Sequence, residues 1–146
     1  MTDNLQIDFY VSKESSQQFA LRTACRIAEK AFKAGLKVHI WTGNESDTQS
    51  LDSLLWTFRD RSFIPHEVYS DSTASSPVTI GSQFGPSEAE MLINISSQFP
   101  ENIEQFQRIA EIIDNREESI HAGRERYRFY REQGHEPQHH EVSSRN

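Results

Sequence analysis

Residues 6–42 read QIDFYVSKESSQQFALRTACRIAEKAFKAGLKVHIWT, and this stretch decides the fold class. Its first part, Gln6–Val11, is apolar and rich in β-forming residues, as is its last part, Lys37–Thr42. The residues between them, from about 15 to 34, have the apolar spacing of an amphipathic helix. A strand, a helix and a strand in this order form a right-handed unit whose two strands are parallel. We therefore predict an α/β protein with three layers, a Rossmann-like and mostly parallel sheet flanked by helices.

The rest of the chain continues the pattern of helices and strands. The sequence predicts a helix at 46–58, strands at 77–80 and 91–96, and helices at 101–113 and 117–132. The helix at 101–113 rests on helical spacing of its apolar residues, which are Ile103, Phe106, Ala110 and Ile113. The chain of 146 residues is one domain's worth. We predict one α/β domain at 1–134, followed by a flexible polar tail at 135–146.

Composition excludes several classes of protein. Hydrophobic residues make up 35% of the chain and charged residues 25%, which suits a globular protein without a membrane span. The acidic N-terminus does not resemble a signal peptide, so we predict a cytoplasmic protein. Residues 1–115 carry 9 Lys and Arg against 16 Asp and Glu, a net −7, whereas residues 116–146 carry six of each and sum to zero. An acidic body argues against nonspecific DNA binding.

Two motifs bear on catalysis and cofactors. The turn after the first strand, VSKESSQQ at 11–18, has no glycine, so it does not predict a nucleotide cofactor. The string H-E-x-x-H occurs as His135, Glu136 and His139, which leaves a metal-dependent hydrolase as an alternative. Pro137 lies inside this motif and disfavours the helix that the two histidines need to hold one zinc ion. We therefore predict no catalytic residue, no metal site and no cofactor.

The last predicted helix carries an unusual row of residues. Four of them recur at i, i+4, i+7 and i+11, with Arg128 at the edge of the row; they are Ile120, Arg124, Tyr127 and Arg131. The row is either a solvated face with intrahelical ion pairs or an anion site. As an anion site, arginines beside a tyrosine ring suit a carboxylate or phosphate accompanied by an apolar group, such as an acidic peptide that ends in a hydrophobic residue. Direct binding of single-stranded DNA is a further alternative, which needs several accessible aromatic rings.

A second group of residues lies at the end of the helix predicted at 46–58. Trp56 points away from that helix's apolar stripe, and Phe63 and Ile64 follow beside two arginines. These aromatic and aliphatic side chains either form a small core of their own or a protein-binding patch, because Trp and Phe framed by Arg match the composition of interface hot spots.

Both groups fall in stretches that resemble the chi subunit of bacterial DNA polymerase III. The stretches are LDSLLWTFRDRSFIPH at Leu51–His66 and RERYRFYREQG at Arg124–Gly134, supported by MLINIS at Met91–Ser96. The resemblance extends over nearly the whole chain to about Gly134. Ile120 stands where some chi proteins have a lysine, and the histidine-rich residues after Gly134 have no counterpart in the resemblance.

The resemblance implies a non-catalytic adaptor subunit of the DNA polymerase III holoenzyme. Chi proteins pair with the psi subunit of the clamp loader and bind the acidic, phenylalanine-ended C-terminal tail of single-stranded-DNA-binding protein during replication. The positions of Arg124, Tyr127 and Arg128 are then expected to bind the tail. Those of Trp56 and Phe63 are expected to bind psi or an alternative DNA-repair helicase.

Overall fold

A computed structural model describes residues 5–13, 17–57, 64–69, 76–86 and 88–142. The elements in chain order are β1 (Gln6–Ser12), α1 (Gln17–Lys33), β2 (Val38–Trp41), α2 (Glu45–Thr57), β3 (His66–Val68), β4 (Val78–Gly81), β5 (Met91–Asn94), a 3₁₀ turn (Ile103–Gln105), β6 (Arg108–Ile113), α3 (Glu117–Glu132) and β7 (Gln138–Val142). The described strands form one seven-stranded sheet in the order β3-β4-β2-β5-β6-β1-β7. Every strand pairing is parallel, which confirms the predicted α/β class.

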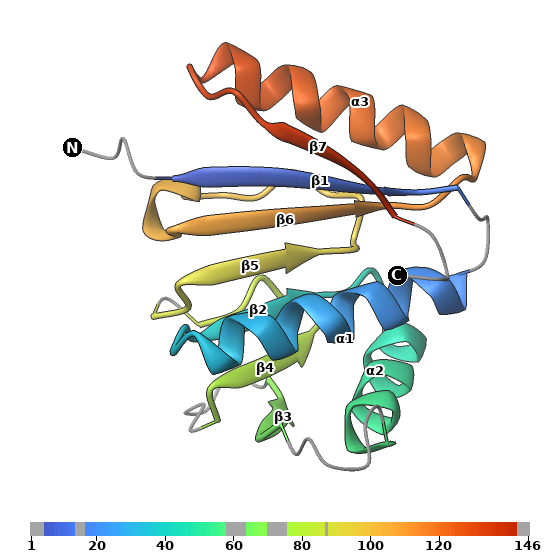
Figure 1. The fold of residues 1–146 in the computed structure, drawn as a ribbon, viewed down its shortest axis with the longest axis vertical. Coiled ribbons are helices and arrows are strands. Elements are labelled where there is room, and N and C mark those ends of the chain that lie inside the picture. The colour runs from blue at the N-terminus through green and yellow to red at the C-terminus, as the bar shows by residue number, and fades with distance from the viewer. Residues whose placement is uncertain (1–4, 14–16, 58–63, 70–75, 87, 143–146) are drawn as a thin grey trace.

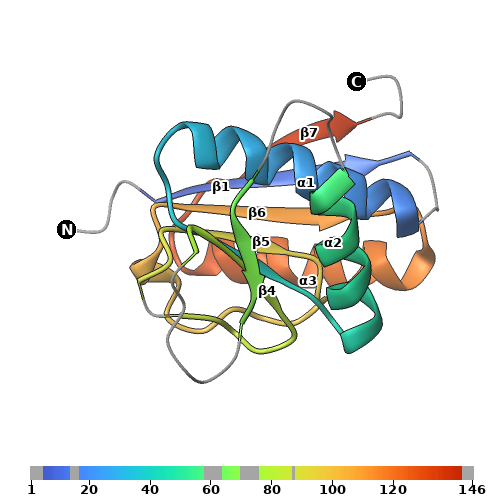
Figure 2. The same cartoon turned by 90° about the horizontal axis from the view of Figure 1, so that it is seen from below.

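The helices cover the two faces of the sheet unequally. Figures 1 and 2 show α1 and α2 on one face and α3 alone on the other, so the molecule has the three predicted layers. One apolar cluster joins α1 and α2 to β2, β4 and β5, and a second joins α3 to β1, β6 and the loops beside them. None of the helices in the described part of the chain has both the length and the apolar character that crossing a membrane requires.

The βαβ unit forms as its sequence predicts. Ala24, Cys25 and Ala28 are fully buried on α1, and these small side chains allow the helix to pack closely on the sheet. Burial raises the pKa of the Cys25 thiol to about 12, as expected of a structural thiol. Gly35 has φ +86° just after α1, the left-handed conformation in which glycine commonly ends a helix.

The prediction of a helix at 101–113 is wrong. Only the short 3₁₀ turn at Ile103–Gln105 is helical there, and Arg108–Ile113 is the central strand β6, paired with β1 and β5. A strand covered on both faces has a continuous apolar run, which periodicity alone does not distinguish from a buried helix. In β6 the residues from Ile109 to Ile113 are all buried, so the contacts that identify the strand lie far away in the sequence.

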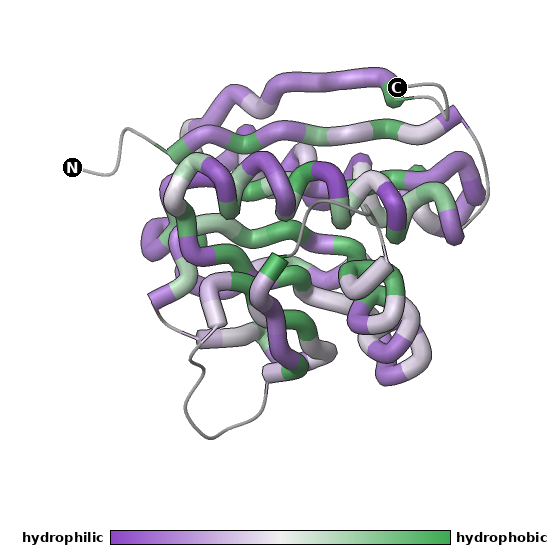
Figure 3. Tube along the Cα trace, turned by 60° about the horizontal axis from the view of Figure 1, so that its bottom comes forward, coloured by the Kyte–Doolittle hydropathy of each residue, from purple (hydrophilic) through white to green (hydrophobic). Residues whose placement is uncertain are grey.

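The prediction of a flexible tail at 135–146 is also partly wrong. Gln138–Val142 forms β7, which pairs with β1 at the sheet edge, so this part of the predicted flexible tail belongs to the sheet. Figure 3 shows the strand that leads to the C-terminus in mostly hydrophilic colours, unlike the inner strands. An edge strand can be polar because its backbone hydrogen bonds to its neighbour while its side chains face solvent. Its composition therefore resembles that of a loop.

Candidate functional site

A largely apolar pocket of about 310 Å³ lies between α3 and the sheet edge formed by β1 and β7. Its lining residues come from four elements and are Phe9, Val11, Ile113, Ile120, Gly123, Arg124, Tyr127 and His139. Phe9 and Val11 alternate with Tyr10 along β1, so both face α3 and form the floor. Figure 1 shows α3 beside β1 and β7, with β7 at the edge of the sheet.

The wall that α3 contributes depends on a close approach to β6. Gly123 is buried, and a Cβ atom added there would lie 2.7 Å from Cδ1 of Ile113. The absence of a side chain at this position lets the helix lie directly against the end of β6. Tyr127 is one helical turn further on, and its ring packs edge-on against Phe9 with 5.4 Å between the ring centroids.

A buried ion pair anchors α3 to the centre of the sheet. Arg126 Nε donates to Oε1 of Glu111 on β6 at 2.6 Å, and the Arg126 side chain is only 2% exposed. The other carboxylate oxygen, Oε2, accepts from the Tyr130 hydroxyl at 2.6 Å and from Asn94 Nδ2 at 3.2 Å. Burial, and then the negative charge of Glu111, raises the pKa of the Tyr130 hydroxyl, so it remains a donor.

This anchor fixes which side of α3 faces the pocket. With Arg126 and Tyr130 turned into the protein, Arg124 and Tyr127 lie toward the opening between α3 and β7. Sequence analysis did not identify Arg126 or Glu111. The signal that could have found them is the glutamate inside the apolar run RIAEII, because a buried carboxylate needs a partner.

The structure divides the row of residues predicted on α3. Ile120, Arg124 and Tyr127 line the pocket together, as their spacing indicates. Arg128 is exposed and lies 3.3 Å from the Glu125 carboxylate one turn earlier, the intrahelical pair that describes a solvated face. Arg131 is also exposed and is not among the lining residues. The row is therefore divided into three residues that line the pocket and two surface arginines that do not.

The second predicted group is divided in a similar way. Trp56 is 57% exposed at the end of α2, and its ring packs edge-on against His66 with 4.8 Å between the centroids. Ile64 is only 1% exposed and belongs to the core beneath α1 and α2, so its assignment to a partner-binding surface is wrong. Ile64 lies two residues before β3 and is turned inward, which its position in the sequence does not reveal. Phe63 lies outside the described residues.

The H-E-x-x-H string does not form the helix that a zinc hydrolase needs. It begins after α3 has ended and continues into β7. His139 lines the pocket beside α3, whereas His135 and Glu136 line another pocket of about 520 Å³ with Asp8. Among the residues that the structure describes, no group of three or more His, Cys, Asp or Glu could hold a metal ion. The geometry gives no support to the hydrolase alternative.

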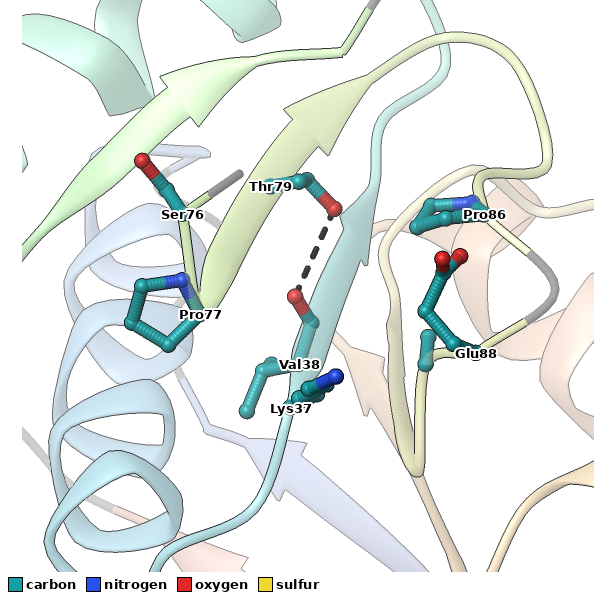
Figure 4. A pocket seen from close by; sticks show the side chains of 8 residues that line it. Lys37, Val38, Ser76, Pro77, Thr79, Pro86 and Glu88 are labelled. Carbon is teal, nitrogen blue, oxygen red and sulfur yellow. Dashed lines mark hydrogen bonds between the residues drawn. The ribbon is translucent and has the colours of Figure 1, made fainter. Parts of the chain in front are cut away.

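A smaller pocket of about 170 Å³ lies at the amino ends of β2 and β4 (Figure 4). Val38 and Thr79 meet in its interior, where Thr79 Oγ1 donates to the Val38 carbonyl at 3.4 Å. Lys37 and Glu88, which also line it, carry opposite charges. Open parallel sheets bind ligands at the carboxyl ends of their strands, which is the opposite edge. We therefore take the pocket beside α3, and not this one, as the candidate site.

The fold and the pocket together define a parallel α/β protein with a largely apolar recess between α3 and the sheet edge. Family comparison agrees, because the model for the DNA polymerase III chi subunit, HolC, matches residues 5–138. The chain belongs to the DNA polymerase III chi subunit family, which confirms the resemblance noted in the sequence.

Curated relatives agree over most of the chain. The DNA polymerase III subunit chi of Pseudomonas aeruginosa is 36% identical over 94% of this chain and 96% of its own length. That of Haemophilus influenzae is 26% identical over 86% of this chain and 90% of its own length. That of Escherichia coli is 26% identical over 75% of this chain and 77% of its own length.

Proposed function

We propose that this chain is a non-catalytic adaptor subunit of DNA polymerase III, and that its α3 pocket binds the acidic C-terminal tail of single-stranded-DNA-binding protein. The observation that carries the proposal is the pocket itself, an apolar recess with an exposed arginine at its rim. In this arrangement Phe9, Val11 and Tyr127 surround a terminal phenylalanine ring, and Arg124 pairs with its carboxylate.

The pocket is large enough to hold an aromatic side chain. Its volume of about 310 Å³ is at the lower end of the range for small-molecule sites, roughly 300–1,000 Å³. A buried aromatic ring contributes a large apolar area for little loss of conformational entropy. A peptide that ends in an aromatic residue therefore places its ring in the apolar recess and its carboxylate beside Arg124.

Charge favours an acidic peptide over a nucleic acid. Residues 1–115 sum to a net −7, so they repel a DNA backbone, while the arginines of α3 lie in the neutral C-terminal part of the chain. Sequence-independent binding of single strands also relies on several bases stacked along a groove. The described pocket offers two aromatic rings in contact with each other, Phe9 and Tyr127, and not a stacking track.

A titration tests the tail site. Calorimetry with a synthetic acidic peptide ending in phenylalanine should give saturable binding, and the same peptide without that phenylalanine should lose it, because the apolar recess is then empty. A bare oligonucleotide serves as the matched anionic control. Equal binding of the two peptides, or tighter binding of the oligonucleotide, contradicts the proposed site.

The surface around Trp56 is the proposed place of contact with psi, or with an alternative helicase partner. The support is the exposed indole, because tryptophan is the residue type most enriched at interface hot spots. This surface lies on α2, on the opposite face of the sheet from α3, so one adaptor could hold both partners at once.

The separation of the two surfaces gives a direct prediction. Trp56→Ala should weaken a psi complex by tenfold or more, on the order of a hot-spot loss, while leaving peptide affinity unchanged. Pull-down with psi and peptide calorimetry measure the two effects. Loss of both activities in a variant that still melts cooperatively would show that the surfaces are not separate.

A further inference from the structure

His139 is a polar residue of the pocket lining to which the proposed function gives no role. It lies on β7, where it is the register partner of Phe9 on β1. Residues paired across parallel strands point to the same face of the sheet, so His139 and Phe9 both face α3. The ring of His139 accordingly lines the pocket on the side of the sheet edge.

The polar groups of the pocket come from two opposed elements. Arg124 and Tyr127 are on α3, and His139 is on β7, while the floor between them is formed by Phe9, Val11 and Ile113. Ile120 on α3 is apolar, so the helix supplies a single cation to the lining. If Arg124 binds a carboxylate at the mouth of this recess, His139 faces that carboxylate from β7 on the other side.

The groups around His139 determine the electrostatic environment of its ring. From α3 it is faced by Arg124 and Tyr127, and β1 and β6 present only apolar lining residues there. Glu141 shares its face of β7 by alternation, and its carboxylate lies 3.6 Å from Lys13 Nζ in an exposed ion pair. The position therefore suits an imidazole that meets an incoming anion.

The neighbouring histidine shows the contrast. His140 points to the opposite face of the sheet, where its Nε2 lies 2.9 Å from Asp8 Oδ1 and its ring stacks on Tyr10 at 4.9 Å. Those contacts hold β7 against β1. His140 thus has a structural place within the protein, and His139 on the same strand is directed into the pocket.

We propose that His139 is a second anion-contacting residue of the peptide pocket, donating a hydrogen bond from β7 to the acidic peptide whose carboxylate Arg124 binds from α3. This inference rests on the proposed function of the same pocket. It makes the histidine-rich strand β7 part of the recognition site and a determinant of its specificity for anionic ligands.

The proposal predicts a dependence of affinity on pH. Imidazole side chains ordinarily gain a proton near pH 6.5, while peptide carboxylates stay ionised down to about pH 4. A carboxylate that accepts a hydrogen bond from an imidazole favours the protonated ring, so binding of an anionic ligand is coupled to proton uptake. Affinity for an acidic peptide ending in phenylalanine should rise roughly threefold to tenfold between pH 8 and pH 6.

The test is calorimetry with that peptide at pH 8 and pH 6, using the full chain and two variants. His139→Gln keeps a neutral hydrogen-bond donor, so it should bind as the unmodified chain does at pH 8 and lose the gain at pH 6. His121→Gln changes an exposed histidine of α3 outside the pocket lining and should keep the gain. Thermal melts of both variants control for folding.

The outcomes separate this inference from the proposed function. A gain at pH 6 that is lost only in His139→Gln supports the inference. Binding that is equally pH-dependent in His139→Gln, or that does not depend on pH in the unmodified chain, overturns it and leaves the tail site standing. Absence of peptide binding at both pH values contradicts the proposed function, and the inference with it.

Discussion

Arg124 and Arg126 are two residues apart on α3, yet they do different work. Arg126 is buried against Glu111 at the centre of the sheet, and Arg124 is exposed at the rim of an apolar pocket. Residues i and i+2 of a helix are about 200° apart around its axis, so one side chain turns inward and the other outward. The first holds the helix in place, and the second is available for recognition. The same residue type thus serves the core in one direction and, in the function proposed above, a binding pocket in the other.

The largest expected effect is loss of stability when the buried pair is broken. Arg126→Ala leaves the Glu111 carboxylate buried without its cation, which should lower the free energy of unfolding by about 3–5 kcal/mol. Denaturant unfolding followed by circular dichroism measures the change. The double variant Arg126→Met, Glu111→Gln removes both charges, keeps an oxygen that accepts from Tyr130 and Asn94, and should recover much of the loss. Unchanged stability in Arg126→Ala would show that the pair does not anchor α3.

An intermediate effect is expected at the pocket rim. Arg124→Ala removes the charged donor to the peptide carboxylate, which should weaken peptide binding roughly tenfold to hundredfold while leaving the unfolding free energy nearly unchanged. Arg22→Ala is a matched control, because Arg22 is an exposed arginine on α1, across the sheet from the pocket. Equal losses in the two variants, measured by calorimetry, would mean that only the overall charge matters.

The smallest effect is expected beyond the pocket. Arg131 is exposed on the last turn of α3 and does not line the recess, so Arg131→Ala should weaken peptide binding less than about threefold. The remaining contribution should disappear at high salt, because an exposed charge acts through solvent. A loss as large as that of Arg124→Ala would extend the binding surface along the helix and remove the distinction between the two groups of arginines.

The candidate site was only partly predictable from the sequence. Helical spacing brought Ile120, Arg124 and Tyr127 together, because residues on one face of a helix are fixed by local geometry. The same spacing also included Arg131, because a helical pattern does not show how far along the helix the pocket extends. Phe9 and Val11 could have been added from the alternation of β1, but nothing local relates them to α3.

The sequence by itself determined the elements whose evidence is local. The βαβ unit at residues 6–42, the glycine that ends α1 and the helix α3 follow from periodicity and backbone preferences, which act over a few residues. The parallel α/β class follows from the order of these elements and the handedness of their connection.

Only the tertiary structure decided the features that depend on contacts between distant residues. β6 is a strand because β1 and β5 pair with it, and polar β7 is a strand because β1 leaves an edge for it. Ile64 is buried, Arg126 is turned inward and His139 faces the pocket for the same reason. Burial and strand pairing depend on residues far apart in the sequence, whereas hydrophobic periodicity reflects only the conformation of a short segment.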